Sequence, residues 1–488
     1  MVAQAQKKHQ QLKSNTEKTP HFKWTTVTIQ EVVEKDYRLE ASVYGIEGRQ
    51  ARKDLDKCKW DIVNFGDEFI ENAFYIGRFK RIYVDKANGI PFILPSQITE
   101  IYPKANKYIS PETNIDIEST RVKKGQILIT RSGTIGVVSY VSKTLEDQSL
   151  SDDVIRIETS DYAGYIYAFL KSKMGRLLIE TNNYGAVISH IEPEHLNNIP
   201  IPNPLAILKQ EINDLIEQSF QLRDESNDLI DEAQELLKQA LQLPEIEKLQ
   251  TTAKQFDKKA GVLNYSVPLS ELNNRLDGSY HVPSVMAIEH HFQKHAKEIT
   301  TISDSRVSKS VILPSHFKRI YVQQGEGTIL IGGKNLYTLD PSDKKYLAPG
   351  QYSDKLRSNM LVSENMIIVS AKGTPGKTVI TPEHWEDWFI SSNLIKIVPA
   401  SSNIAGYLYC FLSSPYGELL LKRQVYGAVV DIFEPVHINS IIFPFCRDDT
   451  TQKIINDKVM LANKKRARAY ELEQEALQLL NDKVIYAI

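Results

Sequence analysis

The sequence predicts an α+β protein in which two β-rich domains of the same fold are separated by two long helices that form an antiparallel coiled coil. Three observations lead to this prediction. The chain repeats itself with an internal pseudo-two-fold duplication, and two segments carry apolar residues at coiled-coil spacing. At 488 residues and 42% hydrophobic content, the chain is also too long for one ordinary core and apolar enough for two or more domains.

The repeat is clearest in one hexapeptide. Phe-Lys-Arg-Ile-Tyr-Val occurs at 79–84 and again at 317–322, an offset of 238. Further matches follow at offsets of 240 to 242: Gly-Thr-x-Gly at 133–136 and 373–376, Gly-Tyr-x-Tyr-x-Phe-Leu at 164–170 and 406–412, and Tyr-Gly-Ala-Val at 184–187 and 426–429. Because the offset drifts in one direction, we interpret the matches as a true duplication with small loop insertions.

Each half has the same predicted order of elements. Alternating apolar residues at 126–130 and 136–140 flank a glycine-containing turn and predict a β-hairpin. Helical spacing at 162–184, and again at 404–425, predicts a helix packed on each sheet. A proline-containing stretch then closes each half and precedes a long helix.

These signals set the domain boundaries. The polar residues 1–22 are expected to form a disordered tail. The remaining segments are a first domain at 23–204, a central long helix at 205–250, a second domain at 262–446 and a C-terminal long helix at 447–488.

The two long helices carry a predicted coiled-coil seam with a 3.5-residue period. Its apolar positions are Ile212, Leu215, Leu222, Leu229 and Leu236 in the first helix, and Ile455, Leu472 and Leu479 in the second. A helix of about 39 residues is ~58 Å long and cannot bury such a stripe alone. The simplest partner is the other helix of the same chain, antiparallel, and the alternative partner is a helix of another subunit.

Composition constrains the setting and the partners. The net charge is −2, but residues 205–250 hold eleven acidic and four basic residues, a net of −7, so the rest of the chain sums to +5. This mild surplus permits DNA binding. Three cysteines without paired spacing predict neither disulfides nor a zinc site and favour a reducing, cytoplasmic location. No signal peptide or membrane span is expected.

Catalytic motifs are not found. The sequence has no phosphate-binding loop of the Walker type, no nucleophile elbow, no zinc-protease motif and no dinucleotide fingerprint, so we expect no catalytic and no metal site. Glu192-Pro193-Glu194-His195, echoed at 434–437, could be an acid/base or metal pair. Proline after an acidic residue is also typical of a helix start, and we favour that interpretation.

The repeated hexapeptide supplies the first candidate DNA contacts. A strand there would place Phe, Arg and Tyr on one face and Lys, Ile and Val on the other, and its polar members could contact phosphates. They are Lys80, Arg81 and Tyr83 in the first copy and Lys318, Arg319 and Tyr321 in the second. The alternative is a structural strand with a basic pair at its surface.

The predicted hairpin tips supply a second set of candidate DNA contacts. They place small hydroxyl residues and a cation on a glycine-enabled turn, which can enter a groove or present backbone N–H groups to phosphate. The candidates are Arg131, Ser132 and Thr134, and Lys372, Thr374 and Lys377. A plain hairpin turn is the alternative. Segments 85–121 and 323–361 differ strongly between the halves, as expected where two domains read different bases.

This order of domain, helix, domain, helix, with the hairpin, helix and Tyr-Gly-Ala-Val motifs occurring twice, resembles the specificity subunit of type I restriction-modification systems, which serve in phage defence. The resemblance implies a non-catalytic subunit with two target recognition domains, each reading one half of a bipartite, asymmetric site in double-stranded DNA. It also implies that the helices set the spacing and dock DNA methyltransferase subunits and a restriction/translocase subunit.

The same resemblance implies that those partners hold S-adenosylmethionine, ATP and Mg, and that the assembled complex is an adenine-specific methyltransferase and endonuclease. Two other functions remain open on the sequence. One is a tandem-domain scaffold held by its coiled-coil helices with no DNA contact. The other is a self-sufficient DNA enzyme with an unrecognised site.

Overall fold

A computed structural model describes most of the chain. The described residues are 24–34, 37–39, 41–181, 190–246, 248–249, 256–257, 262–263, 266–272, 274–341, 343–373, 375–427 and 431–487. The predicted tail at 1–22, the Tyr-Gly-Ala-Val stretch at 184–187 and Thr374 lie outside these ranges.

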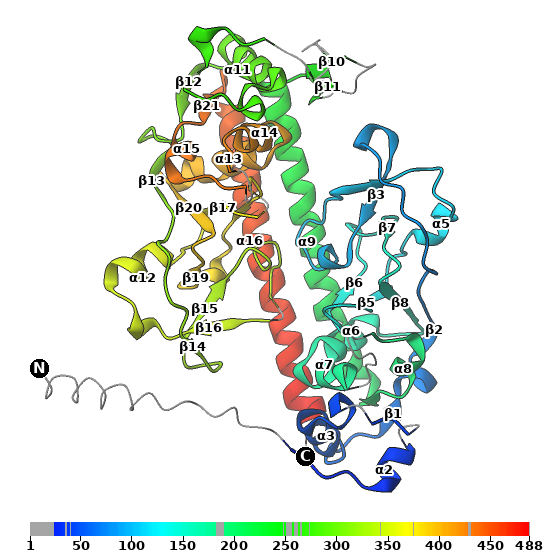
Figure 1. The fold of residues 1–488 in the computed structure, drawn as a ribbon. Helices are drawn as coiled ribbons and strands as arrows, with labels where there is room; N and C mark the ends of the chain where they lie inside the picture. The colour runs from blue at the N-terminus through cyan, green and yellow to red at the C-terminus, as the bar shows by residue number, and fades with distance from the viewer. Residues whose placement is uncertain are drawn as a thin grey trace, which may run out of the picture.

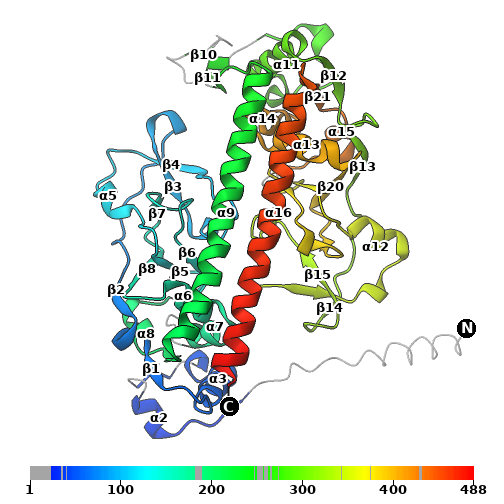
Figure 2. The same ribbon diagram turned by 180° about the vertical axis from the view of Figure 1, so that it is seen from behind.

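Two long helices run side by side through the molecule (Figures 1 and 2). They are α9 (Ala206–Ala240) and α16 (Asp449–Leu480). Lys465 of α16 pairs with Glu225 of α9 at 2.6 Å, and Lys458 pairs with Glu232 at 2.6 Å. Because the residue number falls along one helix as it rises along the other, the pair is antiparallel.

The first domain has short helices and strands before α9. Its helices are α2 (Ile29–Glu34), α3 (Ile46–Leu55), α4 (Phe65–Glu68), α5 (Ile117–Thr120), α6 (Ala163–Lys171), α7 (Lys173–Glu180) and α8 (Pro193–Asn197). Its strands are β1 (Ile62–Asn64), β2 (Ile70–Phe74), β3 (Ile90–Ile93), β4 (Lys107–Ile109), β5 (Ile127–Thr130), β6 (Val138–Tyr140), β7 (Ser149–Leu150), β8 (Val154–Thr159) and β9 (Pro200–Pro202).

Along the chain, the second domain comes after α9 and the short strands β10 (Phe256–Asp257) and β11 (Val262–Leu263), and it comes before α16. Its helices are α11 (Pro283–His295), α12 (Asp354–Met360), α13 (Ser402–Ser413), α14 (Pro415–Arg423) and α15 (Pro435–Asn439). Its strands are β12 (Glu298–Thr301), β13 (Ser308–Ile312), β14 (Tyr321–Val322), β15 (Thr328–Ile331), β16 (Lys345–Leu347), β17 (Ile367–Ser370), β18 (Thr378–Ile380), β19 (Phe389–Ile390), β20 (Leu394–Pro399) and β21 (Ile442–Phe445).

The sheets of the two domains have matching strand orders. A four-stranded sheet has the order β2-β8-β5-β6 in the first domain and β13-β20-β17-β18 in the second. A two-stranded sheet, β1-β9 or β12-β21, lies beside each long-helix end. A third sheet, β4-β3-β7 or β14-β16-β15-β19, contains a parallel pair, β3 with β7 or β15 with β19. We call this third sheet the distal sheet.

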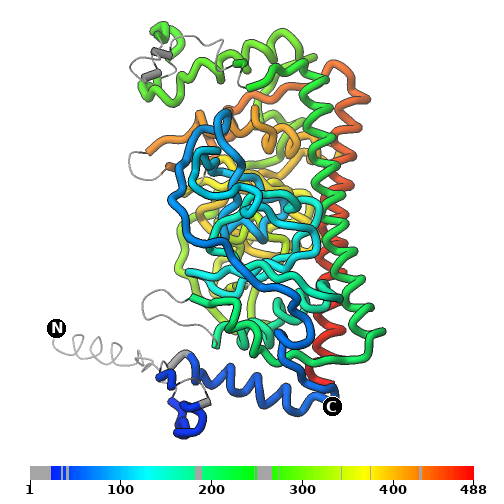
Figure 3. The backbone as a smooth tube through the Cα atoms, turned by 90° about the vertical axis from the view of Figure 1, so that its right-hand side faces the viewer, coloured from blue at the N-terminus to red at the C-terminus, as the bar shows by residue number. Residues whose placement is uncertain are grey.

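Both domains lie on one side of the helix pair and leave its other face uncovered (Figures 2 and 3). The domains also contact each other, because the Ile101 backbone N–H donates to the Tyr337 carbonyl at 2.7 Å. Glu100 forms an antiparallel bridge with Thr338, which is its equivalent at the offset of 238. The expectation that the long helices separate the two domains is therefore corrected.

The hydrophobic cores explain this arrangement. The core of the first domain includes Ile212 and Ile216 of α9 together with Leu480 of α16, all at most 2% exposed. The core of the second domain likewise includes residues of both helices, among them Ile230 and Ile455. Each helix thus buries one face against its partner helix and another against the two domains.

The predicted seam accounts for only part of this burial. Ile212, Ile455 and Leu472 are buried, whereas the other seam positions are half-buried: Leu215, Leu222, Leu229, Leu236 and Leu479. A seam of 3.5-residue period describes contact between two helices alone. Here packing against the domains adds a second buried row, which the heptad pattern did not contain.

One glycine contact joins each domain to its own long helix. The backbone N–H of Gly164, in α6, donates to Asn213 Oδ1 at 2.8 Å, and that of Gly406, in α13, donates to Asn456 Oδ1 at 2.9 Å. A Cβ atom at Gly406 would lie 2.3 Å from the Asn456 carbonyl oxygen. The two helices can approach this closely only because glycine lacks a side chain.

A buried carboxylate links the first domain to both long helices. Glu473 of α16 is fully buried and contacts Lys171 Nζ at 2.6 Å, Arg223 Nη2 at 3.0 Å and the Tyr167 hydroxyl at 2.7 Å. Burial alone would raise the pKa of Glu473, but Arg223 and Lys171 outweigh it and lower the pKa to about 2. The ion pairs therefore tie α6, α9 and α16 together.

Within the described part of the chain, no helix is both long and apolar enough to cross a bilayer.

Replacing Gly406 by alanine should destabilise the protein by about 1–3 kcal/mol, because the new methyl group meets backbone that has no room to move. Gly350→Ala is the matched control, since a Cβ there has nothing within 4 Å. Chemical denaturation of both variants measures the difference. Equal midpoints for the two would show that the α13–α16 contact tolerates a side chain.

Replacing Glu473 by glutamine should cost about 3–5 kcal/mol at neutral pH, because two buried cations lose their counter-charge. The lowered pKa means that this stabilisation is complete above the ordinary pKa of 4.5 and is lost as the pH falls towards about 2. The gap between wild type and variant in unfolding free energy should therefore shrink over that range. Glu475→Gln on the same helix, whose side chain is 58% exposed, should change stability by less than ~0.5 kcal/mol.

Candidate nucleic-acid interface

Each distal sheet carries an exposed tyrosine beside a lysine. Tyr83 is 47% exposed, and Lys107 Nζ lies 5.6 Å from its ring centre. Tyr321 is 49% exposed, and Lys345 Nζ lies 5.7 Å from its ring centre. We define the first patch as Lys80, Tyr83 and Lys107, and the second patch as Lys318, Arg319, Tyr321 and Lys345. All seven side chains are exposed.

Backbone pairing positions these side chains. Tyr321 pairs with Leu347 across β14 and β16, and Tyr83 forms a single bridge with Ile109. Regular strand within the repeated hexapeptide is limited to Tyr321–Val322, and Lys80, Ile82 and Tyr83 are all exposed. The predicted alternation of faces along a strand is therefore corrected. Three of the six residues in each copy of the hexapeptide are therefore exposed.

Lys107 and Lys345, the lysines beside the two tyrosines, were missed from the sequence. Lys107-Tyr108-Ile109 and Lys345-Tyr346-Leu347 are related by the same offset of 238 as the hexapeptide. They lie inside the segments taken as divergent, 85–121 and 323–361. A comparison at fixed offset through those segments would have found them.

A buried cation holds each distal segment against the four-stranded sheet. Arg156 of β8 donates to the carbonyls of Ser119 and Thr120 at 2.7 and 2.8 Å, at the end of α5. Lys396 of β20 donates to the carbonyls of Ser358 and Leu361, both at 2.6 Å, at the end of α12. Burial lowers the pKa of Arg156 to about 10 and that of Lys396 to about 8. The patches are thus attached to a rigid support.

The two copies of the hexapeptide arginine have different surroundings. Arg81 forms an ion pair with Asp152, lies 3.5 Å from Asp153, and donates to Ser151 Oγ at 3.1 Å. Partial burial alone would lower its pKa, but Asp152 raises it above the ordinary value. Arg319 is exposed and has no ion-pair partner among the residues that the structure describes. Only the second copy presents an arginine free to bind an external anion.

The hairpin tips lie closer to the interior than the sequence suggested. Arg131 is 6% exposed, forms an ion pair with Glu192, and stacks with its guanidinium carbon 4.1 Å from the Tyr75 ring centre. Ser132 Oγ donates to Asp153 Oδ1 at 3.0 Å. For Arg131 this geometry favours a structural role over the predicted contact with DNA, because its charge is neutralised internally.

The tip residues of the second hairpin differ from one another. Lys377 Nζ lies 3.6 Å from Glu100 of the first domain and 4.4 Å from the Tyr337 ring centre, so it joins the two domains. Lys372 is half-buried, and its Nζ lies 3.3 Å from His316 Nε2. Lys372 therefore remains a candidate for anion binding, and Lys377 is used within the protein.

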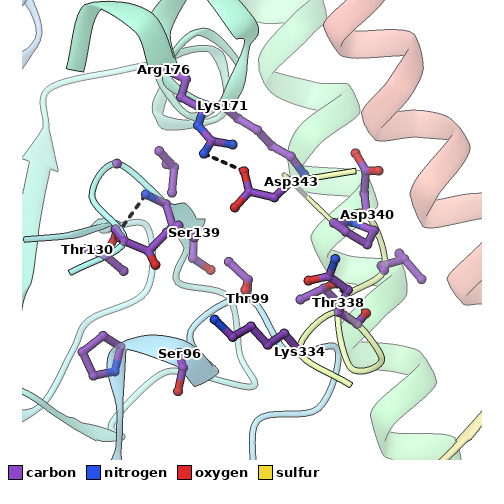
Figure 4. Close-up of a pocket in the computed structure, with 18 of the residues that line it drawn as sticks. Ser96, Thr99, Thr130, Ser139, Lys171, Arg176, Lys334, Thr338, Asp340 and Asp343 are labelled. Carbon is purple, nitrogen blue, oxygen red and sulfur yellow. Dashed lines mark hydrogen bonds and ion pairs between the residues drawn. The ribbon is translucent and has the colours of Figure 1, made fainter. Parts of the chain in front are cut away.

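A cavity of about 480 Å³ lies where the domains meet (Figure 4). Ser96, Thr99, Thr130 and Ser139 line it from the first domain, and Lys334, Thr338 and Asp340 line it from the second. Ser132 and Thr134 also line it, so both lie at the space between the domains. Arg176 Nη2 binds Asp343 Oδ1 at 2.7 Å across this cavity and links the domains.

The acid-histidine motif occupies a helix start in both domains. The Glu192 backbone N–H donates to His195 Nδ1 at 2.9 Å, and the Glu434 backbone N–H donates to His437 Nδ1 at 3.1 Å. Both are capping boxes with proline at the first helical position, in α8 and α15. Burial lowers the pKa of both histidines, which favours the neutral ring that accepts this hydrogen bond.

Among the described residues, no cluster of His, Cys, Asp and Glu could hold a metal ion.

Several known structures are similar to this chain at low identity. The S subunit of a type I restriction-modification system from M. genitalium is 13% identical, with 88% of this chain and 96% of that chain covered and a TM-score of 0.32. The HsdS subunit from Thermoanaerobacter tengcongensis is 14% identical, with 88% and 97% covered and a TM-score of 0.25. A search of curated sequences gives no significant match.

The family model is the informative comparison. The model of the type I restriction modification DNA specificity domain matches residues 67–235, which run from the first four-stranded sheet through the first patch into α9. The match therefore contains the exposed Tyr83 and Lys107 and the buried cation that supports them. Residues 67–235 match this model, so the resemblance to type I specificity subunits is confirmed for the first domain and the start of α9.

Proposed function

We propose that this chain is the non-catalytic DNA-recognition subunit of a restriction-modification complex and that each domain reads one half of a bipartite, asymmetric site. The observation that carries the proposal is the pair of exposed Tyr–Lys patches at equivalent positions of two domains, one of which lies in a DNA specificity domain. Lysine and tyrosine side chains are common phosphate and sugar contacts, and they fix the register of a protein on a duplex.

The antiparallel helix pair supports opposite orientations of the two domains on DNA. Equivalent residues meet at the Glu100–Thr338 bridge, so the domains are related by an approximate two-fold axis through that contact. Two-fold related domains read half-sites in inverted orientation. The exposed loops that follow the two hexapeptides differ. They read Asp-Lys-Ala-Asn at 85–88 and Gln-Gln-Gly-Glu at 323–326, so the two half-sites should differ in sequence.

Spacing between the half-sites follows from rigid connections. Each domain shares its core with both long helices, and the domains are linked to each other by the Ile101–Tyr337 hydrogen bond and the Arg176–Asp343 ion pair. A duplex that contacts both patches must therefore match one fixed separation.

The uncovered face of the helix pair is the proposed docking surface for methyltransferase and restriction subunits (Figure 2). In this proposal S-adenosylmethionine, ATP and Mg are held by those cytoplasmic partners, and adenine methylation and cleavage take place on them. A scaffold that never contacts DNA is the second candidate, favoured by the length of the helix pair. It predicts no salt-dependent DNA affinity.

Footprinting of the assembled complex on its DNA should reveal two protected half-sites separated by an unprotected spacer. Exchanging the exposed loop 85–88 for the residues at 323–326 should alter one half-site and leave the other intact. The reciprocal exchange is the matched control and should alter the other half-site. A single continuous protected site, or no protection with partners present, would contradict the proposal.

Lys107→Ala and Lys345→Ala should each weaken DNA binding to all sequences alike, because a lost phosphate contact carries no base information. Each should reduce the slope of log affinity against log salt by about 0.9. Lys453→Ala, whose side chain on α16 is 79% exposed, is the control and should leave the slope unchanged. Slopes unchanged in both patch variants would place the DNA elsewhere on the domains.

A further inference from the structure

The two domains differ in charge at equivalent positions beside their four-stranded sheets. In the first domain Arg81 is neutralised by Asp152 and Asp153. At the offset of 240, these two acidic residues correspond to Ser392 and Asn393. The second domain has therefore lost both counter-charges while keeping the arginine, Arg319.

The same region of the second domain gains a lysine. At the same offset, Ser132 corresponds to Lys372 and Arg131 corresponds to Ala371. In the first domain Arg131 is neutralised by Glu192. Lys372 instead lies 3.3 Å from His316, which has no negative charge.

His316 contacts two of the changed positions, Lys372 and Ser392, and Arg319 follows it on the same segment. Its Nε2 lies 3.3 Å from Lys372 Nζ, and its Nδ1 lies 3.3 Å from Ser392 Oγ. Arg319 lies three residues after His316 on the same segment, next to the exposed Lys318 of the second patch. Among the described residues, neither Lys372 nor Arg319 forms an ion pair. These side chains thus present unneutralised donors at the surface.

The net charges of the two whole domains also favour binding of a polyanion by the second domain. Residues 23–204 contain 23 Lys and Arg against 25 Asp and Glu, a net of −2, whereas residues 262–446 contain 17 against 16, a net of +1. The second domain has six fewer basic and nine fewer acidic residues than the first, a net difference of three charges. The second domain is the more favourable of the two for a polyanion.

Resting on the proposed function, we propose that His316, Lys372 and Arg319 bind phosphate and grip the DNA backbone, whereas Arg81, the counterpart of Arg319 in the first domain, takes no part because Asp152 and Asp153 hold it internally. The second domain then anchors the complex on DNA without regard to sequence. The first domain contributes less backbone affinity, so its recognition depends more on base contacts. The ligand of these three side chains is a backbone phosphate of double-stranded DNA.

The test measures DNA affinity against salt for the full chain, using a duplex of mixed sequence long enough to span both domains. Arg319→Ala and Lys372→Ala should each reduce the salt slope by about 0.9, since each removes one phosphate contact. Arg81→Ala is the matched variant in the first domain and should leave the slope unchanged. Lys453→Ala on α16 controls for loss of a surface charge.

A gain-of-charge variant supplies an independent readout. Replacing Asp152 by serine and Asp153 by asparagine copies the second domain into the first and should steepen the slope by freeing Arg81. Circular dichroism and thermal unfolding verify that each variant is folded. The reverse change, Ser392→Asp with Asn393→Asp, should flatten the slope without removing any basic residue.

The outcomes separate the two proposals. Equal slope changes for Arg81→Ala and Arg319→Ala, or no change for Arg319→Ala and Lys372→Ala, would overturn the proposed phosphate binding while leaving DNA recognition standing. Absence of salt-dependent DNA affinity in the wild-type chain and in its assembled complex would overturn the proposed function itself.

Discussion

Both domains complete their cores with side chains from both long helices, and the rest of the molecule depends on this constraint. Ile212 of α9 and Leu480 of α16 belong to one core, and Ile230 and Ile455 belong to the other. Because neither domain can rotate without exposing apolar helix surface, their relative position is fixed. The Glu473 ion pairs and the direct contact at Ile101 reinforce this position at two further places.

On this fixed frame the candidate DNA contacts lie on the distal sheets. The buried cations Arg156 and Lys396 transfer the rigidity of the four-stranded sheets to the distal sheets. The exposed Tyr–Lys pairs then occupy equivalent positions, while the loops beside them differ. Such a division separates contacts that hold DNA from contacts that distinguish bases.

The sequence predicted much of the scaffold and less of the site. Repeated motifs predicted the common elements of the halves, because identical core residues impose identical strands and helices. The heptad pattern predicted long helices but not their second buried face, which depends on domain packing absent from any local pattern. Arg131 looked like a surface cation because its partner, Glu192, is 61 residues away. Lys107 escaped notice because the segment around it had diverged.

Contacts between distant parts of the chain also determine when the first domain can finish folding. Tyr167 and Lys171 need Glu473, and the Trp60 indole donates to the Lys483 carbonyl at 2.8 Å. These partners are separated by more than 300 residues, and helix α16 is made long after the first domain leaves the ribosome. Contacts of such high sequence separation form slowly and late. The domain translated first is thus among the last to reach its final core, and until then it exposes the apolar surface that α16 will cover.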